Sequence, residues 1–406
     1  MESIRELYKI GKGPSSSHTM GPKRAANQFL ERHKSAEAFR VTLYGSLAAT
    51  GKGHMTNVAI LEVLEPVAPT EIVWRDDIVL DFHPNGMKFE AIEEGVVTEE
   101  WTVYSIGGGT IASSAEEVNS HKIYPLHTMA DIIEWCDHEG ATYWEYVERY
   151  EGADIWDFLR TIWEAMKSSI AAGLETEGVL PGGLGVRRKA VSYFIKSKSY
   201  NGTLNTRGRL YAYALAVSEE NAAGGDIVTA PTCGSCGVLP AVLYHLYINK
   251  EFSEVRILRA LATAALFGNI AKSNASISGA EVGCQGEVGV ACAMAAAASC
   301  QLFGGTLSQI EYAAEMALEH HLGLTCDPVC GLVQVPCIER NAIAAARALD
   351  SNIYATYSDG KHMVSYDRVV EVMKVTGQDL PSLYRETSVG GLAKDGDIRP
   401  RRSFAK

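Results

Sequence analysis

The sequence predicts an α+β protein, in which an N-terminal α/β domain with a mixed sheet precedes an all-helical domain. Three observations support this fold class. Segments rich in Val, Ile, Thr and aromatic residues are concentrated in the first third of the chain. From about residue 128 onward, apolar residues recur at helical spacing. The helical stretches are also rich in Ala and Gly, which let helices approach closely. We place the first domain at residues 1–120 and the second at residues 125–406.

The first domain is predicted to contain one helix and four strands. Ala25, Ala26, Phe29 and Leu30 fall on one face of a helix over residues 22–34. The predicted strands cover residues 38–44, 72–74, 78–82 and 98–105. A polar connector at residues 112–127 leads to the second domain.

The second domain is predicted to be a set of helices with few strand signals. They cover residues 129–137, 143–150, 155–172, 206–218, 238–246, 253–268, 288–300, 306–322, 339–349 and 366–376. Residues 290–299 read VACAMAAAAS, and such small side chains predict a central helix surrounded by others. This stretch is too short for a membrane span, which needs about 20 apolar residues.

Composition and charge restrict the possible classes of function. The chain has 406 residues and a formal net charge of -12, and no basic patch stands out, which argues against nucleic-acid binding. No apolar run is long enough for a membrane helix, and the N-terminus has no apolar signal-peptide core. We therefore expect a cytoplasmic protein. Its nine cysteines are then expected to be reduced, so clusters of them indicate a metal site or catalysis rather than disulfides.

Two glycine-flanked segments near the N-terminus are candidate binding loops. Residues 13–22 read GPSSSHTMGP. The flanking Gly and Pro residues favour a shaped turn whose hydroxyl and N–H groups hold an anion at the start of the next helix, and the alternative is a flexible loop. Residues 45–57 read GSLAATGKGHMTN and present Lys52 and His54 in a tight turn, without the spacing of a Walker motif.

A third segment, TAPTCGSCG, begins at Thr229 and contains a CxxC pair, Cys233 and Cys236. Such a pair is typical of a thioredoxin-like redox site or of half a zinc site. No βαβ pattern surrounds it and no second ligand pair lies at zinc-finger distance, so both interpretations are disfavoured. The hydroxyls of Thr229 and Thr232 are suited to holding a carboxylate.

Three further cysteines, Cys284, Cys326 and Cys337, are separated by 42 and 11 positions. Cysteine thiolates are the usual ligands of iron–sulfur clusters, and three of them would leave one iron of a four-iron cluster open as a Lewis acid. The alternative is that these cysteines are small buried hydrophobic residues. Their spacing alone does not decide between the two.

Taken together, the motifs resemble those of the iron–sulfur-dependent bacterial L-serine dehydratases. The match covers nearly the whole chain, in the family's order, and includes HPNGM, EGVLPGGL, ENAAGG, NASISGAEVGCQGEVG and CDPVCGLVQVPCIERN. The resemblance implies an α/β domain of substrate-binding type followed by an all-helical catalytic domain. It also implies a [4Fe–4S] cluster held by Cys284, Cys326 and Cys337, and a homodimer or larger homo-oligomer.

The function implied by the resemblance is removal of water from L-serine, which gives pyruvate and ammonia through aminoacrylate. His54 and His18 are the candidate bases for the Cα proton, and His54 is preferred. The other predicted substrate-binding residues are Ser15, Ser16, Ser17, Thr19, Asn221, Thr229, Thr232, Asn274, Ser276 and Ser278. The histidines lie in the first domain and the cysteines in the second, so catalysis requires the two domains to meet.

Several alternatives stay open at this point. Cys233 and Cys330 stand where the family often has other residues, and elimination from L-cysteine or L-threonine is a second interpretation. A pyridoxal-phosphate dehydratase would use Lys272 as its Schiff-base residue. A non-catalytic amino-acid sensor is a third class. Some family members end in a cysteine that reaches back to the cluster, but here no cysteine follows Cys337, so the same tail ligand is not expected.

Overall fold

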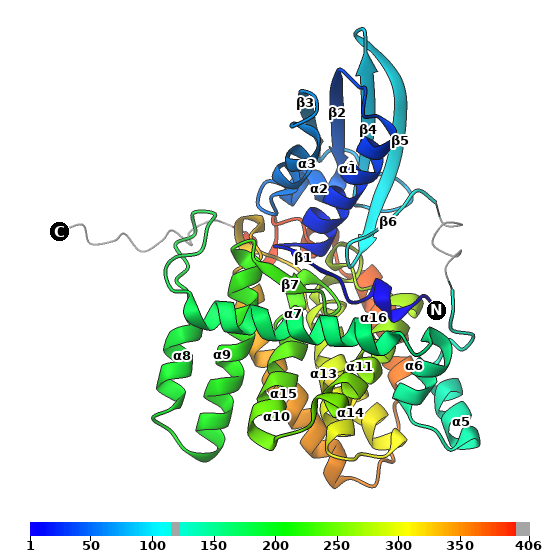
Figure 1. Cartoon of the computed structure of the whole chain (residues 1–406), viewed down its shortest axis with the longest axis vertical. Coiled ribbons are helices and arrows are strands. Elements are labelled where there is room, and N and C mark those ends of the chain that lie inside the picture. Colours follow the sequence, from blue (N-terminus) through cyan, green and yellow to red (C-terminus); the bar gives the residue numbers. More distant parts are fainter. Residues whose placement is uncertain (115–121, 395–406) are drawn as a thin grey trace, which may run out of the picture.

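The computed structural model describes residues 1–114 and 122–394, and it has the α+β architecture predicted from the sequence. An α/β unit stands on one end of a larger helical unit (Figure 1). Each unit has its own hydrophobic core. Part of the predicted connector at residues 112–127 and the last twelve residues lie outside the described residues.

The α/β unit is built on a mixed five-stranded sheet with the strand order β3-β2-β4-β5-β6. The parallel pair is β2 with β3, and the remaining neighbours are antiparallel. The strands are β2 (Ala38–Tyr44), β3 (Thr70–Arg75), β4 (Gly86–Glu93), β5 (Val96–Gly107) and β6 (Thr110–Ala112). Helix α1 (Gly21–Arg32) packs on the sheet through Phe29, whose ring contacts Phe39 and Phe89.

The prediction of a strand over residues 78–82 is wrong, because these residues form a loop. The chain turns after β3, where the Ile78 N–H donates to the Arg75 carbonyl. The Ile78 carbonyl then accepts from the Gly45 N–H rather than from a sheet neighbour. The sheet instead takes its central strand from β4, which pairs with β2 and β5. The charged residues of β4, including Lys88 and Glu90, interrupt the apolar pattern by which a central strand is recognised in a sequence.

The second glycine-flanked segment is also more structured than predicted. Helix α2 (Gly45–Thr50) and helix α3 (Thr56–Leu64) enclose a short turn, and neither helix was expected. Met55 has a left-handed backbone (φ 58°) where the turn passes into α3.

The helical unit is centred on α13 (Val288–Leu302), as the small side chains predicted. Four helices surround it: α10 (Val238–Lys250), α11 (Glu254–Asn274), α14 (Leu307–Glu319) and α15 (Cys337–Tyr357). The outer helices are α5 (Met129–Glu139), α6 (Tyr143–Glu151), α7 (Ile155–Glu175), α8 (Ala190–Ser197), α9 (Gly202–Ala222) and α16 (Tyr366–Asp379). The ten predicted helices are confirmed, whereas α8 and the short helix α12 (Gly279–Val282) were missed.

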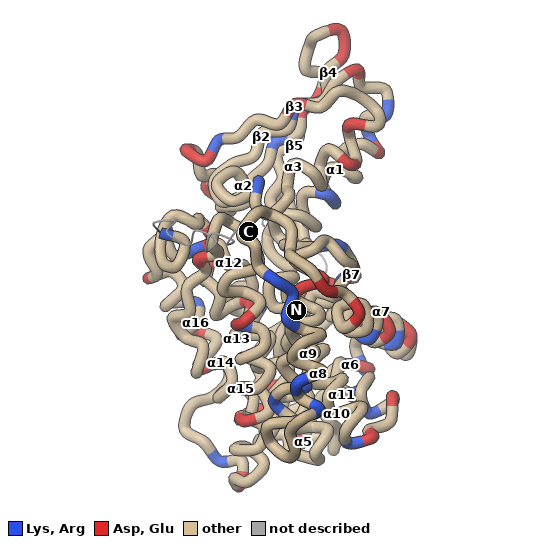
Figure 2. Tube along the Cα trace, turned by 90° about the vertical axis from the view of Figure 1, so that its left-hand side faces the viewer, with Lys and Arg blue, Asp and Glu red and all other residues tan. Residues whose placement is uncertain are grey.

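Charged side chains are distributed over the outside of both units. Figure 2 shows Lys and Arg interspersed with Asp and Glu along the described chain. Within that part of the chain, the helices are too short or too polar to cross a membrane.

The first residues of the chain pack on the helical unit, not on the sheet. Met1, Ile4, Leu7 and Tyr8 are buried in the helical core, and the Tyr8 hydroxyl donates to the Leu261 carbonyl at 2.9 Å. The short strand β1 (Ile10–Lys12) then pairs antiparallel with β7 (Asp226–Val228). The division of the chain at residues 120–125 stays a prediction, and these first residues lie across it.

Gly173 of α7 tests the close packing of this unit. A Cβ at this position would lie 2.3 Å from the backbone oxygen of Ala216 in α9. We expect Gly173→Ala to lower the free energy of unfolding by about 1–3 kcal/mol, because the two helices must move apart. Denaturant unfolding followed by circular dichroism measures this effect. Ala172→Ser, at an exposed position of the same helix, is the control and should change it by less than about 0.5 kcal/mol. Equal stability of the two variants would contradict this packing.

Candidate active site

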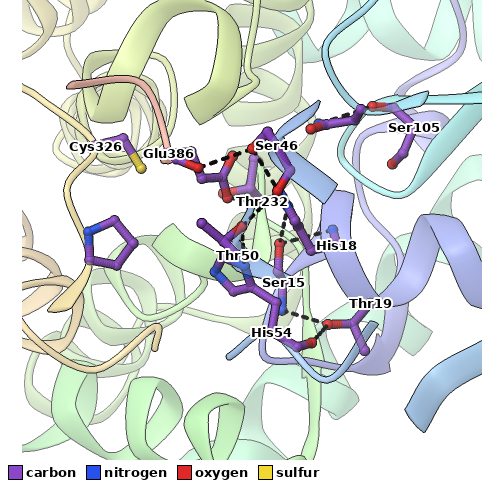
Figure 3. A network of polar contacts seen from close by, with 12 residues as sticks. Ser15, His18, Thr19, Ser46, Thr50, His54, Ser105, Thr232, Cys326 and Glu386 are labelled. Atoms are coloured by element: carbon purple, nitrogen blue, oxygen red, sulfur yellow. Dashed lines mark hydrogen bonds and ion pairs between the residues drawn. The ribbon is translucent and has the colours of Figure 1, made fainter. Parts of the chain in front are cut away.

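The two predicted histidines lie together where the α/β unit meets the helical unit (Figure 3). His18 lies in a single π-helical turn, η2 (Ser16–Met20), which leads directly into α1. His54 lies in the turn that follows α2. Their ring centroids are 4.5 Å apart, and both side chains are buried. Two separate glycine-flanked segments therefore contribute to one site.

Hydroxyl groups of the Ser-rich loop hold these histidines in place. The Ser15 hydroxyl accepts from the His18 N–H at 3.1 Å and so caps the turn. The Thr19 hydroxyl donates to the His54 carbonyl at 2.7 Å. Ser16 and Ser17 are buried beside them. The loop is therefore an ordered turn, and Ser15 and Thr19 have structural hydrogen bonds in addition to any contact with a substrate.

The hydrogen bonds of His54 assign its tautomer. The Thr50 hydroxyl donates its only proton to the Ser46 carbonyl at 3.0 Å. The same hydroxyl lies 3.0 Å from His54 Nδ1 and must accept there, so Nδ1 carries the hydrogen and the lone pair is on Nε2. Burial lowers the pKa of His54 well below its usual value, which keeps the ring neutral at pH 7.

His18 differs because both of its ring nitrogens have partners. Nε2–H donates to the Ser46 carbonyl at 3.1 Å, which leaves the lone pair on Nδ1. Nδ1 lies 3.3 Å from Glu386 Oε1. Burial lowers the pKa of His18 to about 4 and raises that of Glu386 well above its usual range. His18 is therefore neutral at pH 7, and burial favours the protonated form of Glu386 beside it.

Glu386 belongs to the helical unit and links the histidines to a cysteine. Its N–H donates to the Cys326 carbonyl at 2.8 Å, and the Cys326 N–H donates to the Tyr384 carbonyl at 2.8 Å. From the opposite side, the Ser46 hydroxyl donates to the Glu386 carbonyl at 3.0 Å. His18, His54 and Glu386 present ligand atoms within 4.8 Å of one another, a set that is also able to bind a divalent cation.

The three predicted cysteine ligands are buried in the adjoining part of the helical unit. Cys284 lies in η4 (Gly283–Gln285), Cys326 precedes η5 (Val329–Gly331), and Cys337 begins α15. A hydrogen bond from Cys326 and the nearby Arg340 guanidinium together lower the pKa of Cys284 to about 6, against the opposing effect of burial. The same hydrogen bond, with burial, raises the pKa of Cys326, and burial raises that of Cys337.

These properties fit a thiolate-ligated cluster. The lowered pKa of Cys284 favours its thiolate, and the Arg340 guanidinium lies where it balances negative charge. The described cysteines form no disulfide, so all three sulfurs are free to act as ligands. A Cβ on Gly279 would lie 3.1 Å from Cys326 Sγ, so the backbone there leaves room around the sulfur.

Two acidic residues of the site were missed in the sequence. Glu287 Oε1 accepts from the Thr232 hydroxyl at 2.7 Å, and Oε2 lies 3.9 Å from Cys326 Sγ. Burial raises the pKa of Glu287 to about 8. A usable signal was present, because Glu287 follows Cys284 by three positions and begins a long uncharged stretch. Glu386, which lies 49 positions after Cys337, has no comparable sequence signal.

The other predicted binding residues have diverse partners. Asn221 donates to the Pro14 and Cys233 carbonyls at 2.8 and 3.1 Å, which ties the Ser-rich loop to the TAPTCGSCG segment. The Thr229 hydroxyl accepts from the Lys9 N–H and donates to the Leu7 carbonyl, so it is engaged in holding the N-terminal segment.

Three more of them lie at the end of α11 or just after it. Asn274 and Ser276 line a separate cavity of about 440 Å³, together with His83 and Lys272. The Ser278 hydroxyl is buried, and no partner is found for it within the described ranges. Lys272 forms an ion pair with Glu2 at 2.7 Å, so its amino group is occupied away from the three thiols.

The two extra cysteines occupy different surroundings. Cys233 is buried with its sulfur 3.4 Å from Met20 Sδ, beside the Ser-rich loop. Cys330 is exposed and has a left-handed backbone, φ 55°. Its carbonyl lies against the turn that carries His54, where a Cβ on Gly53 would approach it to 2.8 Å.

Comparisons with known proteins give matches over most of the chain. The family model described as serine dehydratase alpha chain matches residues 59–393, and the model described as serine dehydratase beta chain matches residues 3–72. The chain is 41% identical to the L-serine dehydratase TdcG of Escherichia coli, over 97% of this chain and 99% of that protein. It is 41% identical to the L-serine dehydratase of Streptomyces coelicolor, over 96% and 98%. By both comparisons, the chain belongs to the serine dehydratase family.

Proposed function

We propose that the chain is an L-serine ammonia-lyase, which removes water from L-serine and releases pyruvate and ammonia through aminoacrylate. The main supporting observation is that the neutral His54, with its lone pair on Nε2, lies against His18, which faces Glu386. The backbone of Glu386 in turn pairs with that of Cys326, one of the three buried cysteines (Figure 3). The relatives named L-serine dehydratase support the choice of substrate.

Cys284, Cys326 and Cys337 would hold a [4Fe–4S] cluster. When bound with three protein ligands, such a cluster supplies a Lewis acid for the leaving hydroxyl and the substrate carboxylate. Arg340 supports the ligands, because it lies near the Cys284 thiolate while donating to the Thr325 carbonyl and to Asp327. The chain's own contribution is therefore a buried set of thiolates with a fixed counter-charge.

His54 is the proposed base for the Cα proton. Its Nδ1–H is held by the Thr50 hydroxyl, which is itself fixed by the Ser46 carbonyl. This chain of hydrogen bonds presents Nε2 as the acceptor and keeps the imidazole in one tautomer. His18 is less suited to this role, because its two nitrogens face Ser46 and Glu386.

The Ser-rich loop is proposed to bind the substrate carboxylate. Its π-helical turn precedes α1, so N–H groups and hydroxyls are concentrated at a helix start, where an anion is favoured. Ser16 and Ser17 are the hydroxyls best suited to this contact, because Ser15 and Thr19 hold the histidines. The site is closed by the two units together, which excludes water from the reacting atoms. We also propose a cytoplasmic homodimer or larger homo-oligomer.

Anaerobic purification tests this function directly. We expect about four irons and four sulfides per chain and pyruvate release from L-serine, with slower release from L-threonine and L-cysteine. Removal of iron by a chelator should abolish the activity. Iron-free protein that still binds L-serine tightly would instead support an amino-acid sensor. Faster release of pyruvate from L-cysteine than from L-serine would identify L-cysteine as the preferred substrate.

Substitution of the proposed base gives a second test. His54→Ala should lower kcat by about 10²–10⁴-fold at unchanged iron content. Because burial lowers the pKa of His54, the acidic limb of kcat/KM in the unmodified enzyme should lie below pH 6.5. The His54 ring stays neutral as the pH falls to 6.5, and its protonation at a still lower pH removes the base. Near-normal turnover by His54→Ala would exclude this role.

The contact between Gly53 and the helical unit gives a third test. A Cβ on Gly53 would lie 2.7 Å from the Gly331 carbonyl oxygen, so Gly53→Ala must displace the turn that carries His54. We expect kcat to fall by about 10–100-fold while iron content is retained. Lys52→Ala is the matched control, because the Lys52 ammonium lies over the Trp74 ring, 5.5 Å from its centre. Equal activity of the two variants would argue against this contact.

A further inference from the structure

The carboxyl groups of Glu287 and Glu386 have no role in this mechanism, although both face the candidate active site. Each has one oxygen engaged. Glu287 Oε1 accepts from the Thr232 hydroxyl, and Glu386 Oε1 faces His18. The second oxygen of each carboxyl group lacks a good hydrogen-bond donor. Glu386 Oε2 is buried without a hydrogen-bond partner among the described residues, and the Ala280 N–H is the backbone donor nearest to this carboxyl. Glu287 Oε2 has only the thiol of Cys326 at 3.9 Å.

Both glutamates lie beside the same cysteine. Glu287 Oε2 is 3.9 Å from Cys326 Sγ, and the Glu386 N–H donates to the Cys326 carbonyl at 2.8 Å. Arg340 acts on Glu287 from a distance, but its guanidinium is engaged by Thr325 and Asp327. Within the described ranges, no Lys or Arg side chain forms an ion pair with either carboxyl. The site thus gathers acidic groups without a cation directly between them.

Glycines keep the space beside Glu287 open. A Cβ on Gly279 would lie 2.9 Å from Glu287 Oε2, and one on Gly234 would lie 3.1 Å from Oε1. Any larger residue at either position would press on this carboxyl. Two backbone segments therefore leave room around an acid that already has a fixed hydrogen bond on one side.

A buried acceptor without a donor is unfavourable. A ligand that brings N–H donors satisfies the open carboxyl oxygens. An ammonium group does so with three donors on one atom, and its positive charge favours ionisation of the carboxyl group that it meets, whereas a carboxylate or a phosphate brings neither a donor N–H nor a positive charge.

We propose that the free oxygens of Glu287 and Glu386 bind the α-ammonium group of the amino-acid substrate. This inference rests on the proposed function, since it assigns a subsite within the same site. It places the amine on the cysteine side of the junction, and His54 approaches Cα from the α/β unit. The two glutamates then select α-amino acids over the corresponding acids that lack the amine.

Binding of L-alanine and propanoate to the anaerobic holoenzyme tests the subsite. The two ligands differ only in the amine, and neither carries a β-leaving group, so calorimetry measures binding without turnover. We expect the unmodified enzyme to bind L-alanine at least 10-fold more tightly than propanoate. In Glu287→Gln and in Glu386→Gln, the affinity for L-alanine should fall by about 10–100-fold, whereas the affinity for propanoate should not fall.

Glu315→Gln is the matched control, because Glu315 is a buried acid on α14 with an unpartnered oxygen, and its pKa is likewise raised to about 8. It should leave the ratio of the two affinities unchanged. Iron and sulfide are measured for every variant. If a glutamine variant fails to load its cluster, Glu287→Asp and Glu386→Asp take its place, and these should keep a preference for L-alanine because an ionisable carboxyl group is retained.

Four results would overturn the proposal: equal affinity of the unmodified enzyme for both ligands, an unchanged ratio in both glutamine variants, a change in only one of them, or equal weakening of both ligands. Loss of the preference in either aspartate variant would also overturn it. The proposed function fails separately, if the unmodified holoenzyme releases no pyruvate from L-serine.

Discussion

The contact of Ser46 with both His18 and Glu386 is the interaction on which the site depends. The Ser46 carbonyl accepts from His18 and from Thr50, and its hydroxyl donates to the Glu386 carbonyl. A single residue thereby fixes both histidines, one directly and one through Thr50, and binds them to the segment that pairs with Cys326. The two hydrophobic cores are separate, so this junction is what brings the histidines to the thiols.

The chemistry of the site follows from burial at this junction. Removing water lowers the proton affinity of the two histidines and raises that of the two glutamates. Neutral imidazole is what proton abstraction requires, and a buried acid is stable only where a donor or a counter-charge reaches it. Burial of this one site therefore favours a neutral imidazole on the α/β side and a carboxyl acceptor on the helical side.

The sequence predicted the helical unit well because its helices are long and outer ones such as α7 and α16 are amphipathic, whereas the buried α13 was recognised by its run of small residues. It failed where a segment is short or its pattern is mixed. Residues 78–82 are apolar enough for a strand but turn away after β3, and β4 carries Lys88 and Glu90 within a central strand. The histidines were predicted from glycine-flanked motifs. Glu386 was not, because only the fold brings residues so distant in sequence to His18.

Close backbone approach explains why so many glycines of the motifs lie at the site. At Gly53, Gly234 and Gly279, an added Cβ would meet the Gly331 carbonyl or the Glu287 carboxyl within about 3 Å. These three positions have ordinary backbone angles, so the constraint is space and not conformation. A motif residue can thus be required by what faces it across the junction. Sequence patterns identify such glycines, but only the folded chain shows that they leave room for the turn of His54 and for an acid.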